Sequence, residues 1–170
     1  LPCQFLLAAS MNPCPCGYYN DPHRECTCTP GQLQKYRNKI SGPLLDRFDL
    51  QLEVVPVSFQ DLHQTGNEES SAAIRQRVIA ARQIQQKRFA GSSTIHNGAM
   101  NVTQIQQYCK LDEKSTRFLE QAFQKLGLSA RAHNRILKVA RTIADLAGSE
   151  QIQLQHLAEA IQYRTLDKKL

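Results

Sequence analysis

The chain has 170 residues, of which 41% are hydrophobic and 21% are charged, and this balance indicates a folded globular protein rather than a disordered one. Its longest apolar run, residues 5–9, is far too short to cross a bilayer, so we expect no membrane partner. Residues 1–72 carry five Lys/Arg against eight Asp/Glu (net −3), whereas residues 73–170 carry sixteen against seven (net +9). A basic second half favours an anionic partner, either nucleotide phosphates or nucleic acid, although a solvated basic surface has the same composition.

The first third of the chain predicts a small α/β unit. Residues 4–9 form a continuous apolar segment, which is typical of a strand buried in a sheet that is covered on both faces. Residues 31–40 predict a short helix, and residues 48–57 predict a second strand because they alternate and are rich in β-branched side chains. We therefore expect an α/β part at 1–57, followed by a polar linker at 58–72.

The rest of the chain predicts helices. Acidic residues open one predicted helix and glycines close two, while Ser129 has the type and position of an N-cap. We expect an all-α bundle over residues 73–170, so that the protein is mainly α overall. The predicted helices are 71–91, 101–109, 112–127, 129–148 and 151–164.

A loop at residues 12–30 holds two Cys-x-Cys pairs, Cys14 with Cys16 and Cys26 with Cys28. In an extended chain, residues i and i+2 point to the same side, so two such pairs can surround one tetrahedral ion. Zinc bound by four thiolates in a closed structural site fits this pattern best, and His23 could replace one thiol. The alternatives are unmetallated thiols, an iron–sulfur cluster or disulfides. We expect no disulfides because nothing in the sequence suggests export, which favours a reducing, cytoplasmic location.

Two polar side chains near the predicted strands point to phosphate chemistry. Asn12 follows the first predicted strand, and ligands of open α/β sheets collect at the carboxyl ends of strands. Arg47 lies ahead of the second predicted strand, where a fixed guanidinium could stabilise charge on a transferring phosphoryl group. Asn12 could equally be a turn residue, and Arg47 could form a local ion pair with Asp46 or Asp49.

Arg131 and Arg135 lie four residues apart at the start of the predicted helix 129–148. Like charges at this spacing repel each other, and cations are unfavourable at a helix N-terminus. An anion that binds at this end would remove both problems. The alternative is that both side chains extend into solvent.

Three stretches of the chain resemble the magnesium-chelatase-like AAA+ ATPases: AASMNPCPCGYYNDPHRECTCTPGQLQKYRNKISGPLLDRFDLQLEV, SARAHNRILKVARTIADLAG and HLAEAIQYR. The resemblance implies that residues 1–57 are the C-terminal strands of a P-loop ATPase core with a Cys-rich insert, and that residues 73–170 are its helical lid. It implies ATP and Mg²⁺ as cofactors. Asn12 would be sensor 1, Arg47 the arginine finger that reaches an adjacent subunit, and Arg131 sensor 2, with Arg135 as the alternative.

The phosphate-binding loop G-x-x-x-x-G-K-[ST] does not occur in the 170 residues, and the chain begins Leu-Pro-Cys. We therefore expect a C-terminal portion of a longer protein, inactive by itself. The family forms rings, usually hexamers, and its branch linked to bacterial competence moves branched DNA junctions. The resemblance thus implies an ATP-driven DNA helicase or branch-migration translocase. The alternatives are a motor subunit of a magnesium chelatase and a zinc-dependent nucleic-acid-binding module without motor activity.

Overall fold

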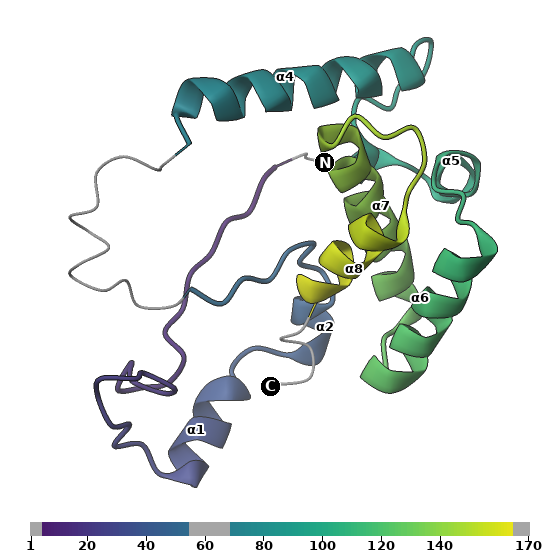
Figure 1. Ribbon diagram of the computed structural model, residues 1–170. Helices are drawn as coiled ribbons and strands as arrows, with labels where there is room; N and C mark the ends of the chain where they lie inside the picture. Colours follow the sequence, from purple (N-terminus) through teal and green to yellow (C-terminus); the bar gives the residue numbers. More distant parts are fainter. Residues whose placement is uncertain (1–4, 55–68, 165–170) are drawn as a thin grey trace.

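The computed structural model describes residues 5–54 and 69–164, and these residues are mainly helical (Figure 1). Two short helices lie in the first third of the chain, and the helices after residue 69 form a bundle. In chain order the elements are α1 (Pro30–Arg37), α2 (Gly42–Leu45), α4 (Ser71–Arg88), the 3₁₀ helix η1 (Asn97–Ala99), α5 (Val102–Tyr108), α6 (Glu113–Leu126), α7 (Ala130–Leu146) and α8 (Leu154–Gln162).

The predicted strands 4–9 and 48–57 are wrong for the parts of them that the structure describes. Residues 5–9 and 48–54 contain no strand. A strand exists only where a neighbouring strand takes its backbone hydrogen bonds, and within the described residues no such neighbour lies beside either segment. Their apolar side chains are exposed instead of buried, with Leu6 94% and Val54 89% exposed. The α/β part of the predicted fold is therefore not confirmed by the described residues, whereas the mainly α character is confirmed.

The predicted helices are confirmed, and their ends follow the predicted caps. The Ser129 side chain accepts a hydrogen bond from the backbone N–H of Ala132 and so begins α7. Gly127, which ends α6, and Gly148, just beyond α7, both have positive φ, at 61° and 67°, which glycine adopts without strain. The predicted linker 58–72 lies largely outside the described residues.

The core of the bundle forms around α7, which packs against α8, α5, η1 and the second half of α4. Ile136, Ala140 and Ala144 lie along the buried face of α7, where they meet Leu157 of α8 and Phe89 beyond α4. Spacing of three to four residues on one face is the pattern that buries a helix against its neighbours. Within the part of the chain that the structure describes, this apolar core is therefore built from the residues of the helical bundle.

A buried ionic cluster joins α4, η1 and α7. The Arg88 guanidinium donates to both carboxylate oxygens of Asp145, at 2.5 and 2.6 Å, and Arg141 donates to the same carboxylate at 3.1 Å. The Asn97 amide donates to Asp145 at 2.7 Å and to the Thr142 hydroxyl at 3.1 Å. These contacts fix the second half of α4 on the bundle. The first half extends beyond it, and residues 71–80 are all exposed (Figure 1).

The segment around α2 packs against the C-terminal end of α8. The Gln51 amide donates to the Tyr163 carbonyl at 2.9 Å, and the buried Arg164 guanidinium donates to the Phe48 carbonyl at 2.5 Å. Arg164 also donates to the Asp46 carboxylate at 3.3 Å. Residues 46–51 are therefore attached to the helical bundle although they lie outside its apolar core.

Candidate functional site

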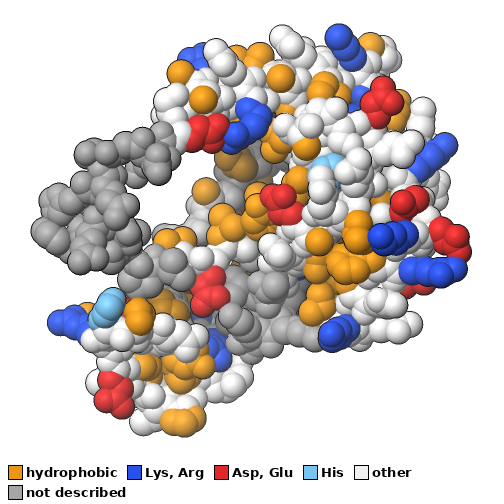
Figure 2. Space-filling view, in the orientation of Figure 1, with side chains coloured by type: hydrophobic (Ala, Val, Ile, Leu, Met, Phe, Trp, Pro, Cys, Tyr) orange, Lys and Arg blue, Asp and Glu red, His pale blue; other side chains and the backbone are white. Residues whose placement is uncertain are grey.

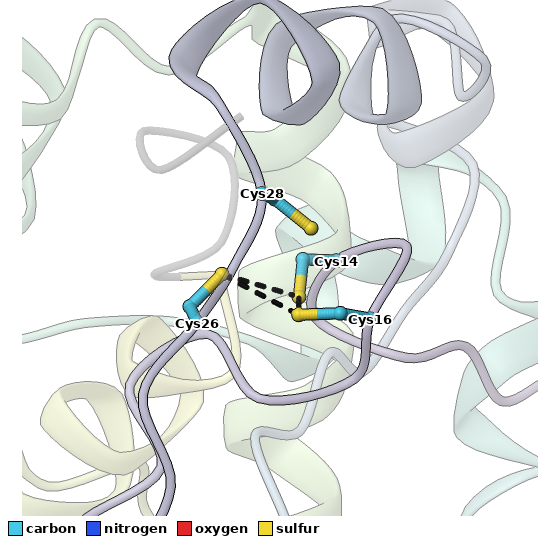
Figure 3. Close-up of side chains that lie close together, drawn as sticks. All are labelled: Cys14, Cys16, Cys26 and Cys28. Atoms are coloured by element: carbon cyan, nitrogen blue, oxygen red, sulfur yellow. Dashed lines mark hydrogen bonds between the residues drawn. The ribbon is translucent and has the colours of Figure 1, made fainter.

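The four cysteines of the loop converge on one point (Figure 3). Their sulfur atoms all lie within 4.8 Å of one another. The Sγ atoms of Cys14 and Cys16 are 3.3 Å apart. The Sγ atom of Cys26 lies 3.7 Å from that of Cys14 and 3.6 Å from that of Cys16. The predicted grouping of the two Cys-x-Cys pairs is therefore confirmed.

The loop between the two pairs is shaped by tight turns. Gly17 has a φ of 87° and Asn20 a φ of 63°, values that glycine and asparagine tolerate better than other residues. The Asp21 carboxylate accepts hydrogen bonds from the backbone N–H groups of His23 and Arg24, at 2.7 and 2.9 Å. These turns bring the chain back, so that Cys26 and Cys28 face Cys14 and Cys16.

The cysteine cluster fits a zinc ion. Four thiolates around tetrahedral zinc, with Zn–S of about 2.3 Å, have sulfurs about 3.8 Å apart, close to the distances between Cys14, Cys16 and Cys26. A backbone hydrogen bond at Tyr18 lowers the pKa of Cys16 to about 5, which favours the thiolate form that binds metal cations. Burial raises the pKa of Cys28 to about 12. His23 is exposed and does not belong to the group.

Arg47 follows α2 and is exposed. The local ion pairs considered for it are not formed, because both neighbouring carboxylates have other partners. Asp46 accepts from the Ser129 hydroxyl at 3.1 Å and from Arg164, and Asp49 pairs with Arg135 at 2.5 Å. Within residues 5–54 and 69–164, Arg47 makes no ion pair.

The two arginines at the start of α7 have different environments. Arg135 is half-buried and its ion pair with Asp49 supplies an anion from the chain itself. Arg131, one turn earlier, is exposed and has no ion pair with any described residue. The anion that the sequence predicted at this end is thus a carboxylate for Arg135, while Arg131 has no counter-ion among residues 5–54 and 69–164.

Asn12 lies at the edge of the cysteine loop. Its side chain is exposed and lies close to Gly17. An alanine at position 17 would place its Cβ atom 4.0 Å from the Asn12 Nδ2 atom. The contacts of the described residues bring Arg131 and the segment of Arg47 together, but they do not bring Asn12 to either arginine.

Sequence reasoning missed the residues that build this junction. Asp46, Asp49 and Ser129 were recognised only as neighbours of the arginines or as a cap, and Arg164 was not recognised at all. Nothing in the local sequence marks Arg164, since its partners Asp46 and Phe48 are more than one hundred residues earlier in the chain.

None of the helices in the described part of the chain is both long enough and apolar enough to cross a membrane.

Comparison with known proteins supports the motifs described above. Residues 68–164 match the family described as magnesium chelatase, subunit ChlI C-terminal, and residues 1–62 match the family described as magnesium chelatase, subunit ChlI. The chain is 47% identical over 170 residues to the competence protein ComM of Haemophilus influenzae. It is 45% and 46% identical to the uncharacterized protein YifB of Salmonella typhimurium and of Escherichia coli. Each match covers 99% of this chain and 32% of the relative, so the chain spans about one third of the length of these proteins. The chain therefore belongs to the magnesium-chelatase-like family that includes ComM and YifB.

Proposed function

We propose that this chain supplies arginine contacts for ATP hydrolysis in a magnesium-chelatase-like AAA+ motor. One observation carries the proposal. The two carboxylates that flank Arg47 bind other partners: Asp49 pairs with Arg135, and Asp46 accepts from Ser129 and Arg164. Arg47 and Arg131 are exposed and have no counter-ion among the described residues. The two segments that carry them are joined to each other by these contacts. Unpaired guanidinium groups held on fixed segments are suited to bind the phosphates of a nucleotide.

The roles of the three residues follow from the family resemblance. Arg47 is the arginine finger, which reaches the ATP of an adjacent subunit, and Arg131 is sensor 2, which binds the ATP of its own subunit. Asn12 is sensor 1, which positions the attacking water. ATP and Mg²⁺ are the cofactors. The physical reason for an arginine in the first role is that its fixed positive charge stabilises the developing charge of the transferring phosphoryl group.

The four cysteines hold a structural zinc ion in this proposal. Four thiolates leave no open coordination position, so the ion would stabilise the loop and would not take part in hydrolysis. Cys14, which is fully buried, would be its most enclosed ligand.

The motor acts on DNA in this proposal, as a hexameric helicase or branch-migration translocase in the cytoplasm. Support comes from the name of the Haemophilus influenzae relative, a competence protein, and from the net charge of +9 over residues 73–170. The match to magnesium chelatase subunits supports the alternative of a motor that serves a chelatase. ATP hydrolysis that is stimulated by forked DNA, and not by a porphyrin-binding partner, would select the DNA motor.

The arginine roles are tested in a chimera in which this chain replaces the matching region of the Haemophilus influenzae ComM protein. Arg47→Ala and Arg131→Ala should each lower kcat for ATP by at least about a hundredfold, since an arginine finger contributes about 10³–10⁵ to this rate. Arg117→Ala is the matched control because Arg117 is an exposed arginine on α6 that pairs only with Glu113 among the described residues. Mixing Arg47→Ala subunits with active ones should lower the activity of the neighbours, whereas full activity of both single variants would refute the proposal.

A further inference from the structure

Three of the five tyrosines of the chain lie between residues 18 and 36, and each has a cation close to its ring. The Arg24 guanidinium lies 4.8 Å from the centre of the Tyr18 ring, and the Arg37 guanidinium lies 4.7 Å from that of Tyr19. The Lys39 ammonium is 5.9 Å from the Tyr36 ring. We call these six residues the tyrosine surface: Tyr18, Tyr19, Arg24, Tyr36, Arg37 and Lys39.

The cysteine cluster and α1 place these side chains together. Tyr18 and Tyr19 follow Cys16 directly, and α1 begins two residues after Cys28, with the Thr29 side chain as its N-cap. The contact between Arg37 and Tyr19 joins the last turn of α1 to the cysteine loop. The cysteine loop, which carries Tyr18 and Tyr19, and α1, which carries Tyr36, are therefore held together both by the cysteine cluster and by this contact.

The tyrosine surface is accessible. All three rings are half-buried, Arg24 and Lys39 are exposed, and α1 buries no residue. A helix without a buried residue contributes nothing to the core of the protein, so its polar and aromatic side chains are available to a partner.

Positive charge gathers here within an otherwise acidic first third of the chain. Residues 18–39 carry four Lys/Arg against two Asp/Glu, whereas residues 40–54 carry one against three. One of the two acids, Asp21, already accepts two backbone hydrogen bonds. In Figure 2, the lower left, over the cysteine loop and α1, shows side chains coloured as hydrophobic with basic side chains at their margins and acidic ones nearby.

We propose that the tyrosine surface binds single-stranded nucleic acid, with bases stacked on the tyrosine rings and phosphates bound by Arg24, Arg37 and Lys39. Every base has a flat π-face, so stacking on tyrosine is tolerant of sequence, and basic side chains between the rings follow the charged backbone. In a duplex the base faces are covered by their neighbours, and therefore only an unpaired strand can use this surface. This inference rests on the proposed function, which supplies the nucleic-acid partner. Its new part is the surface that contacts this partner.

The test is fluorescence anisotropy of a labelled oligothymidylate of about 15 nucleotides, the upper range of sites covered by one small binding fold, titrated with the zinc-loaded 170-residue chain. Tyr19→Ala combined with Tyr36→Ala should weaken binding by at least about tenfold, since each stacked base contributes about fivefold or more. Tyr19→Phe combined with Tyr36→Phe should retain binding because phenylalanine keeps the flat ring. Tyr163→Ala is the matched control, since Tyr163 follows α8 and lies outside the tyrosine surface.

Salt dependence tests the phosphate contacts separately. Arg37→Gln and Lys39→Gln should each reduce the slope of log Kd against log salt by about 0.7, the value for one phosphate contact in a single strand. Arg117→Gln on α6 should leave the slope unchanged. A slope that is equally affected by all three substitutions would overturn the proposal.

A readout on the unmutated chain avoids any effect of substitutions on folding. Ultraviolet crosslinking to an oligonucleotide that contains 5-iodouracil should label Tyr18, Tyr19 or Tyr36. Crosslinks found only on α4, equal or tighter binding of the matching duplex, or no binding at low salt would each overturn the proposal. None of these assays contains ATP, so a negative result here would not contradict the arginine roles. A negative result in the ATPase test would likewise not contradict nucleic-acid binding by the tyrosine surface.

Discussion

Asp49 and Arg135 form an ion pair, with 2.5 Å between Oδ1 and Nη1, that joins the segment of Arg47 to the helix of Arg131. A second connection lies beside it, because the Ser129 hydroxyl donates to the Asp46 carboxylate at 3.1 Å. The two arginines proposed to bind nucleotides thus extend from segments that are held together. A shift of α7 would move Arg47 with it, so in the proposed ring this junction would link the nucleotide sites assigned to Arg47 and Arg131.

Arg164 should be the stronger anchor of this junction, and Arg135 the weaker one. The Arg164 side chain is 1% exposed and donates to Phe48 and Asp46, so Arg164→Met should lower the free energy of unfolding by about 2–3 kcal/mol. Arg135→Met should cost less than about 1 kcal/mol, because its partner Asp49 is 65% exposed and solvent screens the pair. Urea denaturation measures both, and equal losses would show that the junction does not depend on the buried anchor.

The buried ionic cluster should be essential for the bundle. Asp145 is the shared acceptor of Arg88, Arg141 and Asn97, so Asp145→Ala leaves two buried guanidinium groups without a carboxylate. Breaking a buried pair in this way costs about 3–5 kcal/mol, and thermal unfolding should show a large fall in Tm. Glu113→Ala removes an exposed carboxylate that pairs with Arg117, and its cost should stay below about 1 kcal/mol. A Tm of Asp145→Ala that matches this control would contradict the assigned role.

The helices could be predicted because their signals are local. Caps such as Ser129, helix-ending glycines such as Gly127 and a repeat of three to four residues are all contained within one helix. The prediction of strands at residues 5–9 and 48–54 was wrong because a strand depends on partners elsewhere in the chain. A run such as residues 5–9 has the composition of a buried strand, but only a neighbouring strand determines whether it becomes one.

The candidate site was predicted only in part. The cysteine cluster could be found because its two pairs lie within fifteen residues, so spacing alone constrains their geometry. The partner of Arg135 could not be found, because Asp49 lies 86 residues away and any of several acids would have served equally well on local grounds. Pairing across such a distance is a property of the fold rather than of a motif.

Metal removal should affect the cysteine loop and leave the bundle intact. The purified chain should contain about one zinc per molecule by elemental analysis, and Cys14→Ser should lose it. Cys109→Ala should keep the zinc because Cys109 lies in the helical core, apart from the cluster. After chelation, limited proteolysis should cut between residues 12 and 30 while the helical signal of the bundle persists, since α1 contributes no buried residue. A full complement of zinc in Cys14→Ser would exclude this site.

Cys109 should make the protein less stable in alkali. Burial raises the pKa of its thiol from 9.0 to about 11, so the folded state favours the neutral form and the unfolded state ionises first. The stabilising effect is complete below about pH 9 and is lost as the pH rises through 11; by about pH 10 it should have fallen by about 1.4 kcal/mol. Urea denaturation at neutral pH and near pH 10 measures this loss. Cys109→Ala should lack it because alanine has no thiol to ionise, and the cavity that the substitution creates lowers the free energy of unfolding equally at both pH values. A pH dependence that is identical in the two proteins would mean that Cys109 ionises as readily in the folded chain as in the unfolded one.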